Sequence, residues 1–119
     1  MSATFTVNGV VNTASANMSS QTLTPSTSIT WDLSQGQIST ITLTMNSTIT
    51  AVNNMKIGTY ILHVYQDSTG SRTLTWPSSI FKWTASVTPP LTSAAGSHDV
   101  YTFVSDGSKM YGSFIPDVR

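Results

Sequence analysis

Alternation of apolar and polar residues is the dominant pattern along this chain. Over residues 28–33, Ile29, Trp31 and Leu33 alternate with polar residues, and residues 40–45 repeat the pattern with threonine at every polar position. A period of two over such lengths is typical of a strand with one buried face. Threonine is β-branched, so it suits the outer face of a strand without adding charge.

Several more segments carry the same strand signal. Residues 60–66 are apolar at both alternating sets of positions, which is typical of a central strand covered on both sides. Turn residues follow at 67–71, and we expect residues 72–76 to return as the second strand of a hairpin. Asp106-Gly107 is a further hairpin signal. No segment has a helical period. The other predicted strands span residues 48–52, 80–83, 99–104 and 109–114.

Strand number and turn spacing together predict the fold class. Seven to eight short strands with turns every few residues are typical of an all-β protein, here an antiparallel β-sandwich of jelly-roll or immunoglobulin-like type. Residues 28–119 are expected to form this sandwich. Residues 1–27 are less apolar and almost uncharged, and we expect an N-terminal arm or an added strand held by the sandwich or by a partner subunit.

Charge is scarce in this composition. The 119 residues include five Lys and Arg, five Asp and no Glu, so the net charge is zero and only 8% of residues are charged, against about 25% in an ordinary soluble domain. Serine and threonine make up a third of the chain instead. Five scattered cations do not form a nucleic-acid surface. The chain has no Cys, which excludes disulfides and thiolate chemistry.

The beginning of the sequence carries no targeting signal. It lacks the basic and apolar regions of a secretory signal peptide, and the chain has no apolar run long enough to cross a membrane. We therefore expect synthesis in a cytoplasm and no membrane partner.

The string Q-D-S-T-G-S-R-T-L-T-W-P at residues 66–77 is the most specific motif of the chain. Together with the segments given below, it makes residues 31–114 resemble a β-sandwich module of tailed-phage virion proteins, especially tail-fibre and other minor structural proteins. The module usually has a glycine pair after Lys82-Trp83, where this chain has Thr84-Ala85-Ser86. It also usually has Trp or Tyr at the position of Met110. The resemblance implies a virion module that is commonly trimeric and brings no catalytic residues. Further matching segments are W-D-L at 31–33, I-T-L at 41–43, G-T-Y-I-L at 58–62, K-W at 82–83, P-L-T at 90–92, D-V-Y-T-F at 99–103 and D-G-S-K-M-Y-G at 106–112.

The side chains in the most specific string suit a structural role. The amide of Gln66 can pair across a strand end, and Asp67 and Gly70 supply a turn-closing carboxylate and a residue for positive φ. An ion pair between Arg72 and Asp67 would close the predicted hairpin. These four residues are interpreted as a hairpin motif.

Candidate catalytic and metal-binding groups are few. A Ser-His-Asp triad could be assembled around His63 or His98, but with 19 serines such a coincidence is expected, and no nucleophile elbow is present. A metal site from His98, Asp99 and Asp106, or from His63, fits no standard ligand spacing. The aspartates sit mostly at turns rather than as a facing pair. We therefore expect no enzyme activity, no metal and no cofactor.

Aromatic residues are the better candidates for a binding surface. Trp83, Trp76, Tyr65 and Tyr111 are predicted either to form a platform for a glycan or to fill a subunit interface. Complete burial of all three tryptophans, Trp31 included, would argue against glycan binding.

These observations predict a non-enzymatic structural protein of a bacteriophage virion. The preferred interpretation is a capsid decoration or head-fibre protein that acts by oligomerisation and docking, because the chain is short and has no fibre shaft. The alternative is a tail-fibre or baseplate-tip module that binds a host surface glycan. The expected partners are further copies of the chain, as a homotrimer, and other virion proteins.

Overall fold

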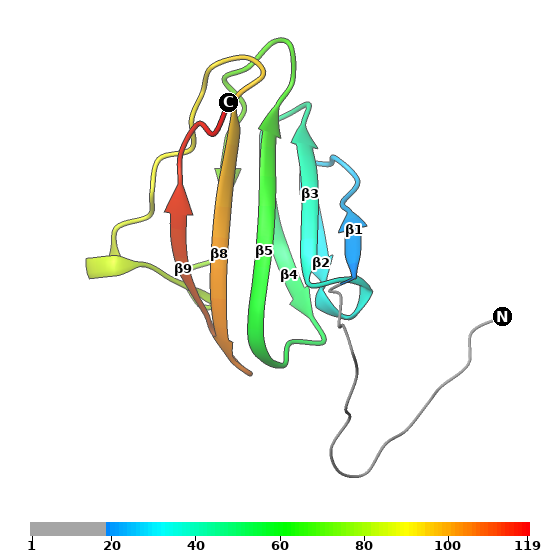
Figure 1. Cartoon of the computed structure of the whole chain (residues 1–119), viewed down its shortest axis with the longest axis vertical. Coiled ribbons are helices and arrows are strands. Elements are labelled where there is room, and N and C mark those ends of the chain that lie inside the picture. The colour runs from blue at the N-terminus through cyan, green and yellow to red at the C-terminus, as the bar shows by residue number, and fades with distance from the viewer. Residues whose placement is uncertain (1–18) are drawn as a thin grey trace, which may run out of the picture.

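The computed structural model describes residues 19–119, which form two packed β-sheets (Figure 1). One sheet has six strands in the order β1-β3-β5-β8-β9-β7, and the other has three in the order β2-β4-β6. Two single turns of 3-10 helix, η1 and η2, interrupt the strands. The elements are β1 Ser20–Thr22, β2 Ser28–Asp32, η1 Leu33–Gln35, β3 Ile38–Leu43, β4 Ser47–Asn53, β5 Ile57–Gln66, β6 Leu74–Thr75, β7 Phe81–Lys82, η2 Thr84–Ser86, β8 His98–Asp106 and β9 Met110–Ile115.

The core lies between the two sheets and is built by the alternation seen in the sequence. Trp31 of β2 is completely buried, its indole Nε1–H donates to Ser39 Oγ of β3 at 2.9 Å, and its ring meets the edge of Phe103 of β8. Both sheets therefore contribute to one core, and the prediction of an all-β sandwich is confirmed. Other core side chains include Ile29, Ile41, Leu43, Ile49, Leu62, Val64, Phe81, Tyr101 and Met110.

Strand direction differs from the prediction, because the sheets are mixed rather than antiparallel. β1, β3 and β5 are parallel neighbours, β5, β8 and β9 are antiparallel, and all three strands of the small sheet are parallel. From β2 to β5, consecutive strands belong to alternate sheets. β2 therefore lies beside β4, and β3 lies beside β5. The alternation of residues shows which face of a strand is buried but not which strand is its neighbour.

Of the two predicted hairpins, one forms. β8 and β9 are antiparallel around Asp106-Gly107, with Val104 opposite Tyr111. The hairpin expected between residues 60–66 and 72–76 is wrong, because β6 lies in the small sheet and pairs in parallel with β4. β5 is the central strand that the sequence predicts, between β3 and β8. Only its inward side chains lie under the second sheet, however.

The outward side of the large sheet has no second layer over it in the described part of the chain. We call this surface the outer face, formed by the outward side chains of β3, β5, β8 and β9. On β5, Ile61, His63 and Tyr65 are half-buried by their neighbours, whereas Val104 and Ile115 are 57% and 55% exposed. The expectation that residues 60–66 are covered on both sides is therefore only half correct.

The N-terminal part of the predicted domain division is described only from residue 19. Ser20–Thr22, which fall within the expected arm, form β1 at the edge of the large sheet beside β3, and Leu23 joins the core. Residues 1–18 lie outside the described residues, so the arm and its boundary after residue 27 stay predictions. In residues 19–119, no helix is long and apolar enough to span a membrane.

Candidate functional site

A crossing segment, residues 74–83, brings two of the candidate tryptophans together. β6, an edge strand of the small sheet, ends at Thr75, and β7 lies beside β9 at the edge of the large sheet. Between them the carbonyl of Pro77 accepts hydrogen bonds from the N–H groups of Ile80 and Phe81 at 3.1 and 3.0 Å. This tight turn reverses the chain, so that Trp76 before it and Trp83 after it lie on the same end of the sandwich.

The two tryptophan rings are fixed by edge-to-face packing. The ring centroids of Trp76 and Trp83 are 5.5 Å apart at an interplanar angle of 73°, and Phe81 meets Trp76 at 4.9 Å. Tyr101 lies against Trp76 at 4.8 Å. Aromatic pairs in such arrangements contribute about 0.5–1.5 kcal/mol beyond their buried area. Trp76 remains only 8% exposed, whereas Trp83 is half-buried.

A glycine makes room for the ring of Trp83. A Cβ atom added to Gly112 of β9 would overlap Trp83 Cζ3 and would lie 2.8 Å from Trp83 Cε3 and 2.9 Å from Phe103 Cε1. The absence of a side chain at this strand position lets the indole lie directly against the backbone of β9. Glycine in a strand interior commonly marks such a close approach.

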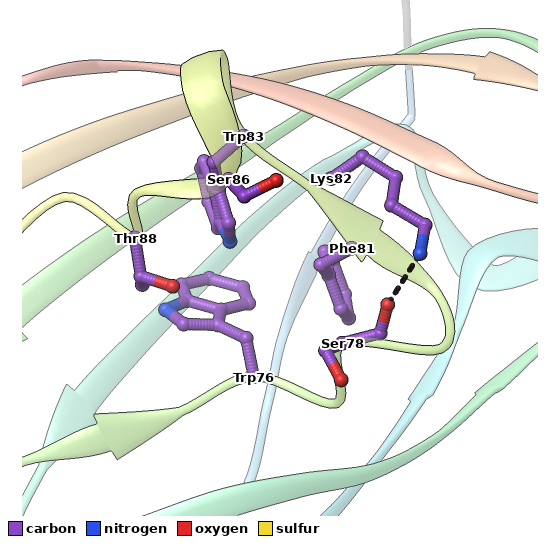
Figure 2. Close-up of a pocket in the computed structure, with 7 residues that line it drawn as sticks. All are labelled: Trp76, Ser78, Phe81, Lys82, Trp83, Ser86 and Thr88. Carbon is purple, nitrogen blue, oxygen red and sulfur yellow. Dashed lines mark hydrogen bonds between the residues drawn. The ribbon is translucent and has the colours of Figure 1, made fainter.

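The aromatic residues surround a small hollow, shown in Figure 2. Its volume is about 160 Å³. Figure 2 shows Trp76, Phe81 and Trp83 around the hollow, with the short polar side chains of Ser78, Ser86 and Thr88 placed along its margin. Lys82 reaches back over the turn, and its Nζ donates to the carbonyl of Ser78 at 2.7 Å. We call this the aromatic hollow.

A second, more open hollow lies on the other side of β7. It has a volume of about 400 Å³ and shares Lys82 and Trp83 with the aromatic hollow. Tyr111, which is 47% exposed, contributes to it from β9, and its hydroxyl donates to Asp106 Oδ2 at 2.9 Å. That bond raises the pKa of Tyr111 and helps to lower the pKa of Asp106. The other lining residues are Thr84, Thr102, Val104, Gly112 and Ser113.

Of the four aromatic candidates, Tyr65 lies apart. Its ring stacks on His98 of β8 on the outer face, with centroids 4.1 Å apart. His98 in turn shares a 2.8 Å hydrogen bond between its Nε2 and Nδ1 of His63. Desolvation, and then the nearby His98, lower the pKa of His63. The structure therefore joins Trp76, Trp83 and Tyr111 around β7 and places Tyr65 elsewhere.

The four residues of the predicted hairpin motif bond one another within one loop, although the strands on either side of that loop belong to different sheets. Buried Gln66 donates through Nε2 to the carbonyls of Arg72 and Thr92 at 2.8 and 3.0 Å, and its Oε1 accepts from the N–H of Arg72 at 3.0 Å. Asp67 pairs with Arg72 at 3.0 Å and also accepts from the N–H of Gly70. The bond from Arg72 is the main cause of the lowered pKa of Asp67.

Gly70 brings this loop against its neighbour. It has a φ of +73°, in the left-handed region, and a Cβ there would lie 2.7 Å from the backbone nitrogen of Ala95. The loop after β5 thus packs directly on the loop before β8.

The acidic and histidine candidates for a metal site do not come together. Asp99 is buried on the inward side of β8, where its carboxylate accepts from the N–H groups of Thr92 and Asp117 at 2.7 and 2.8 Å. Asp106 lies at the other end of β8, and the two histidines are on the outer face. Within residues 19–119, no group of three or more His, Cys, Asp or Glu could hold a metal ion.

Sequence reasoning missed several residues of the aromatic hollow. Phe81 and Lys82 carried only the signal of the short strand at residues 80–83. Gly112 carried a usable signal, because a glycine inside a predicted strand indicates that another group approaches closely. The partner of that glycine could not be inferred without the pairing of β7 with β9.

Comparison with known families decides the identity. Residues 23–110 match the sequence model of a family described as "Putative phage tail fibre C-terminal domain". The match spans most of the chain and includes Trp76, Trp83 and β7. The chain belongs to this family. No curated protein and no solved structure matches it.

Membership of the tail fibre family settles the broad class of the protein. The resemblance to a virion module is confirmed, and the chain is a phage structural component and part of the virion. The preference for a capsid decoration or head-fibre protein is not supported. That preference came from the shortness of the chain, which carries no information about its place on the particle.

Proposed function

We propose that this tail fibre domain binds a glycan on the host cell surface and that the aromatic hollow is the binding site. A sugar ring has apolar C–H faces and a rim of hydroxyl groups. It therefore suits a site that combines aromatic walls with a few polar groups, which is the usual composition of a small-molecule pocket. The aromatic hollow has both features, with tryptophan and phenylalanine walls and serine and threonine hydroxyls along the margin.

The observation that carries this proposal is the state of Trp83. Its ring is supported by Gly112 and meets Trp76, Tyr101 and Phe103, yet it stays only half-buried and lines both hollows. Burial of all three tryptophans would have argued against glycan binding, but only Trp31 is completely buried. A large apolar ring that is rigidly held at the surface is the usual anchor of a binding site.

Binding to immobilised bacterial surface polysaccharides tests the proposal. The wild-type chain is expected to bind a subset of them, and Trp83→Ala is expected to abolish binding. Tyr65→Ala is the matched control, because it removes another half-buried aromatic ring that lies away from the hollow. Equal loss of binding in both variants would contradict the assignment of the site, as would unchanged binding in Trp83→Ala.

We also propose that the domain self-associates, as a trimer, through the centre of the outer face. Ile61, Val100 and Ile115 lie there with His63, and Asp106 at the far end of β8 is the one formally charged residue among the outward positions of the four strands. Copies can therefore meet on this surface without burying unpaired charges. The same composition agrees with assembly into a virion alongside other structural proteins, after synthesis in the bacterial cytoplasm.

A further inference from the structure

The few cations of this chain are unevenly distributed. Two of the five, Arg72 and Arg119, form ion pairs with Asp67 and Asp117. Two others, Lys82 and Lys109, converge on the turn beside the aromatic hollow. Lys82 Nζ donates to the carbonyl of Ser78 at 2.7 Å, and Lys109 Nζ donates to the carbonyl of Ser79 at 2.8 Å.

Neither lysine forms an ion pair within residues 19–119. A carbonyl oxygen holds an ammonium group in place without neutralising it, and an ammonium has three N–H donors. Each Nζ is therefore fixed by one carbonyl and keeps two donors for another acceptor. Because the two carbonyls belong to adjacent residues, both ammonium groups are anchored at the turn that forms one edge of the hollow through Ser78 and Phe81. Lys82 lines the hollow itself, whereas Lys109 is held at the turn without lining it.

Carboxylates are absent from the lining of both hollows. Asp106, in the β8–β9 hairpin, is bonded to Tyr111, which lines the second hollow. Its oxygens accept hydrogen bonds from the N–H groups of Ser108 and Lys109 and from the hydroxyl of Tyr111. In a chain with no net charge, this edge thus carries a local excess of positive charge.

We propose that the saccharide bound at the aromatic hollow is anionic. Its sugar ring lies against Trp83, and its carboxylate or phosphate group accepts hydrogen bonds from Lys82 and Lys109. This inference rests on the proposed glycan-binding function and adds the chemical class of the ligand. Hydrogen bonds between ammonium and anionic oxygens are stronger than those between neutral groups, so the two lysines would discriminate between charged and neutral sugars.

Matched pairs of polysaccharides separate the charge from the sugar. Bacterial surface polysaccharides that contain uronic acids are compared with their carboxyl-reduced forms, and phosphate-bearing polysaccharides with their dephosphorylated forms. Wild-type affinity for at least one type of pair is expected to fall about tenfold or more when the charge is removed, since hydrogen bonds to a charged group contribute more to binding than those to a neutral group. The type of pair that responds identifies carboxylate or phosphate as the recognised group.

Lysine variants connect this discrimination to the structure. The double variant Lys82→Gln/Lys109→Gln is expected to bind both members of a pair equally. Lys82→Arg/Lys109→Arg, which keeps the charge, is expected to retain the preference for the anionic member. Lys56→Gln is the control for the loss of a cation elsewhere, since Lys56 is exposed and lines neither hollow. Thermal unfolding of each variant verifies that the 78–79 turn survives.

The outcomes distinguish this inference from the function on which it rests. Equal binding of charged and neutral forms by the wild-type chain, with loss of binding in Trp83→Ala, would overturn the anionic ligand and leave glycan binding intact. A preference for the charged form that persists in the double glutamine variant would overturn the role of the lysines. Failure to bind any polysaccharide of the panel would overturn both proposals.

Discussion

At the scale of single residues, the aromatic hollow depends on a position that has no side chain. Trp83 occupies the space beside Gly112 that a Cβ would fill, and Phe103 closes the other side. Sequence alone indicated the two tryptophans, because large aromatic residues are the usual candidates for a glycan platform or a subunit interface. It could not indicate which face of Trp83 is supported, because that depends on the pairing between β7 and β9.

Gly112→Ala is expected to displace Trp83 and weaken glycan binding while the fold persists. The new methyl group would overlap the indole of Trp83, so the ring must move. Overpacking of this kind lowers the free energy of unfolding by about 1–3 kcal/mol. Tryptophan fluorescence and thermal unfolding measure the displacement and the cost. Ser113→Ala, at the next position and on the opposite side of β9, is the control. An unchanged emission spectrum in Gly112→Ala would contradict the close approach.

Strands and loops form the next scale, where the pattern of residues predicted the elements better than their partners. The inward positions of β2 and β3 were predicted correctly from alternation, and the Asp106-Gly107 hairpin from its turn residues. The loop after β5 has turn residues as well, yet it leads into the other sheet. Its sequence closes a compact loop, and nothing in a loop sequence specifies whether the next strand returns to the same sheet.

Gln66→Leu is expected to destabilise this loop. Gln66 is 4% exposed and bonds both the N–H and the carbonyl of Arg72 as well as the carbonyl of Thr92. A buried polar group that loses its partner costs about 1–3 kcal/mol, so the unfolding free energy should fall by at least that amount. Urea unfolding measures the change, and Gln35→Leu, at an exposed position on η1, is the control. Equal stability of the two variants would show that the Gln66 bonds do not hold the loop.

Acid is expected to destabilise the domain between about pH 4 and pH 2. Hydrogen bonds from the N–H groups of Ser108 and Lys109 lower the pKa of Asp106 from 3.8 to about 2, and bonds led by Asn54 do the same for Asp32. Because the folded-state pKa lies below the unfolded one, the stabilisation is complete above about pH 4 and is lost as the pH falls towards 2. The free energy of unfolding, measured with urea across this range, should therefore depend less on pH for Asp106→Asn than for the wild-type chain. Parallel pH profiles for the two proteins would exclude Asp106 as a contributor.

At the scale of the whole molecule, the mixed topology leaves one broad surface to which residues 19–119 supply no covering layer. β2 to β5 alternate between the sheets (Figure 1). The outward side of the large sheet then presents threonine, isoleucine, valine and histidine. Residues 60–66 were expected to be covered on both sides, because both sets of their side chains are apolar. The described residues provide only one of these covers, and a second copy of the domain would provide the other.

Ile115→Lys is expected to convert the proposed trimer to monomers. A lysine at this position would place like charges from several copies on one interface, where desolvation of unpaired charge is unfavourable. Sedimentation velocity measures the mass. Val87→Lys is the control, because Val87 is also exposed but follows η2 and is not on the outer face. The wild-type mass should change little with salt, since the surface has few charges to screen. A wild-type chain that is monomeric would contradict self-association.

The central claim is that the aromatic hollow of this tail fibre domain binds host glycans, and the indole N–H signals of its three tryptophans test it most directly. Each N–H gives a separate signal in a ¹⁵N–¹H spectrum, and buried Trp31 serves as an internal reference. Addition of fragments from a bound polysaccharide is predicted to shift the signals of Trp76 and Trp83 in a saturable manner and to leave that of Trp31 in place. Saturable binding that shifts neither Trp76 nor Trp83 would contradict the account.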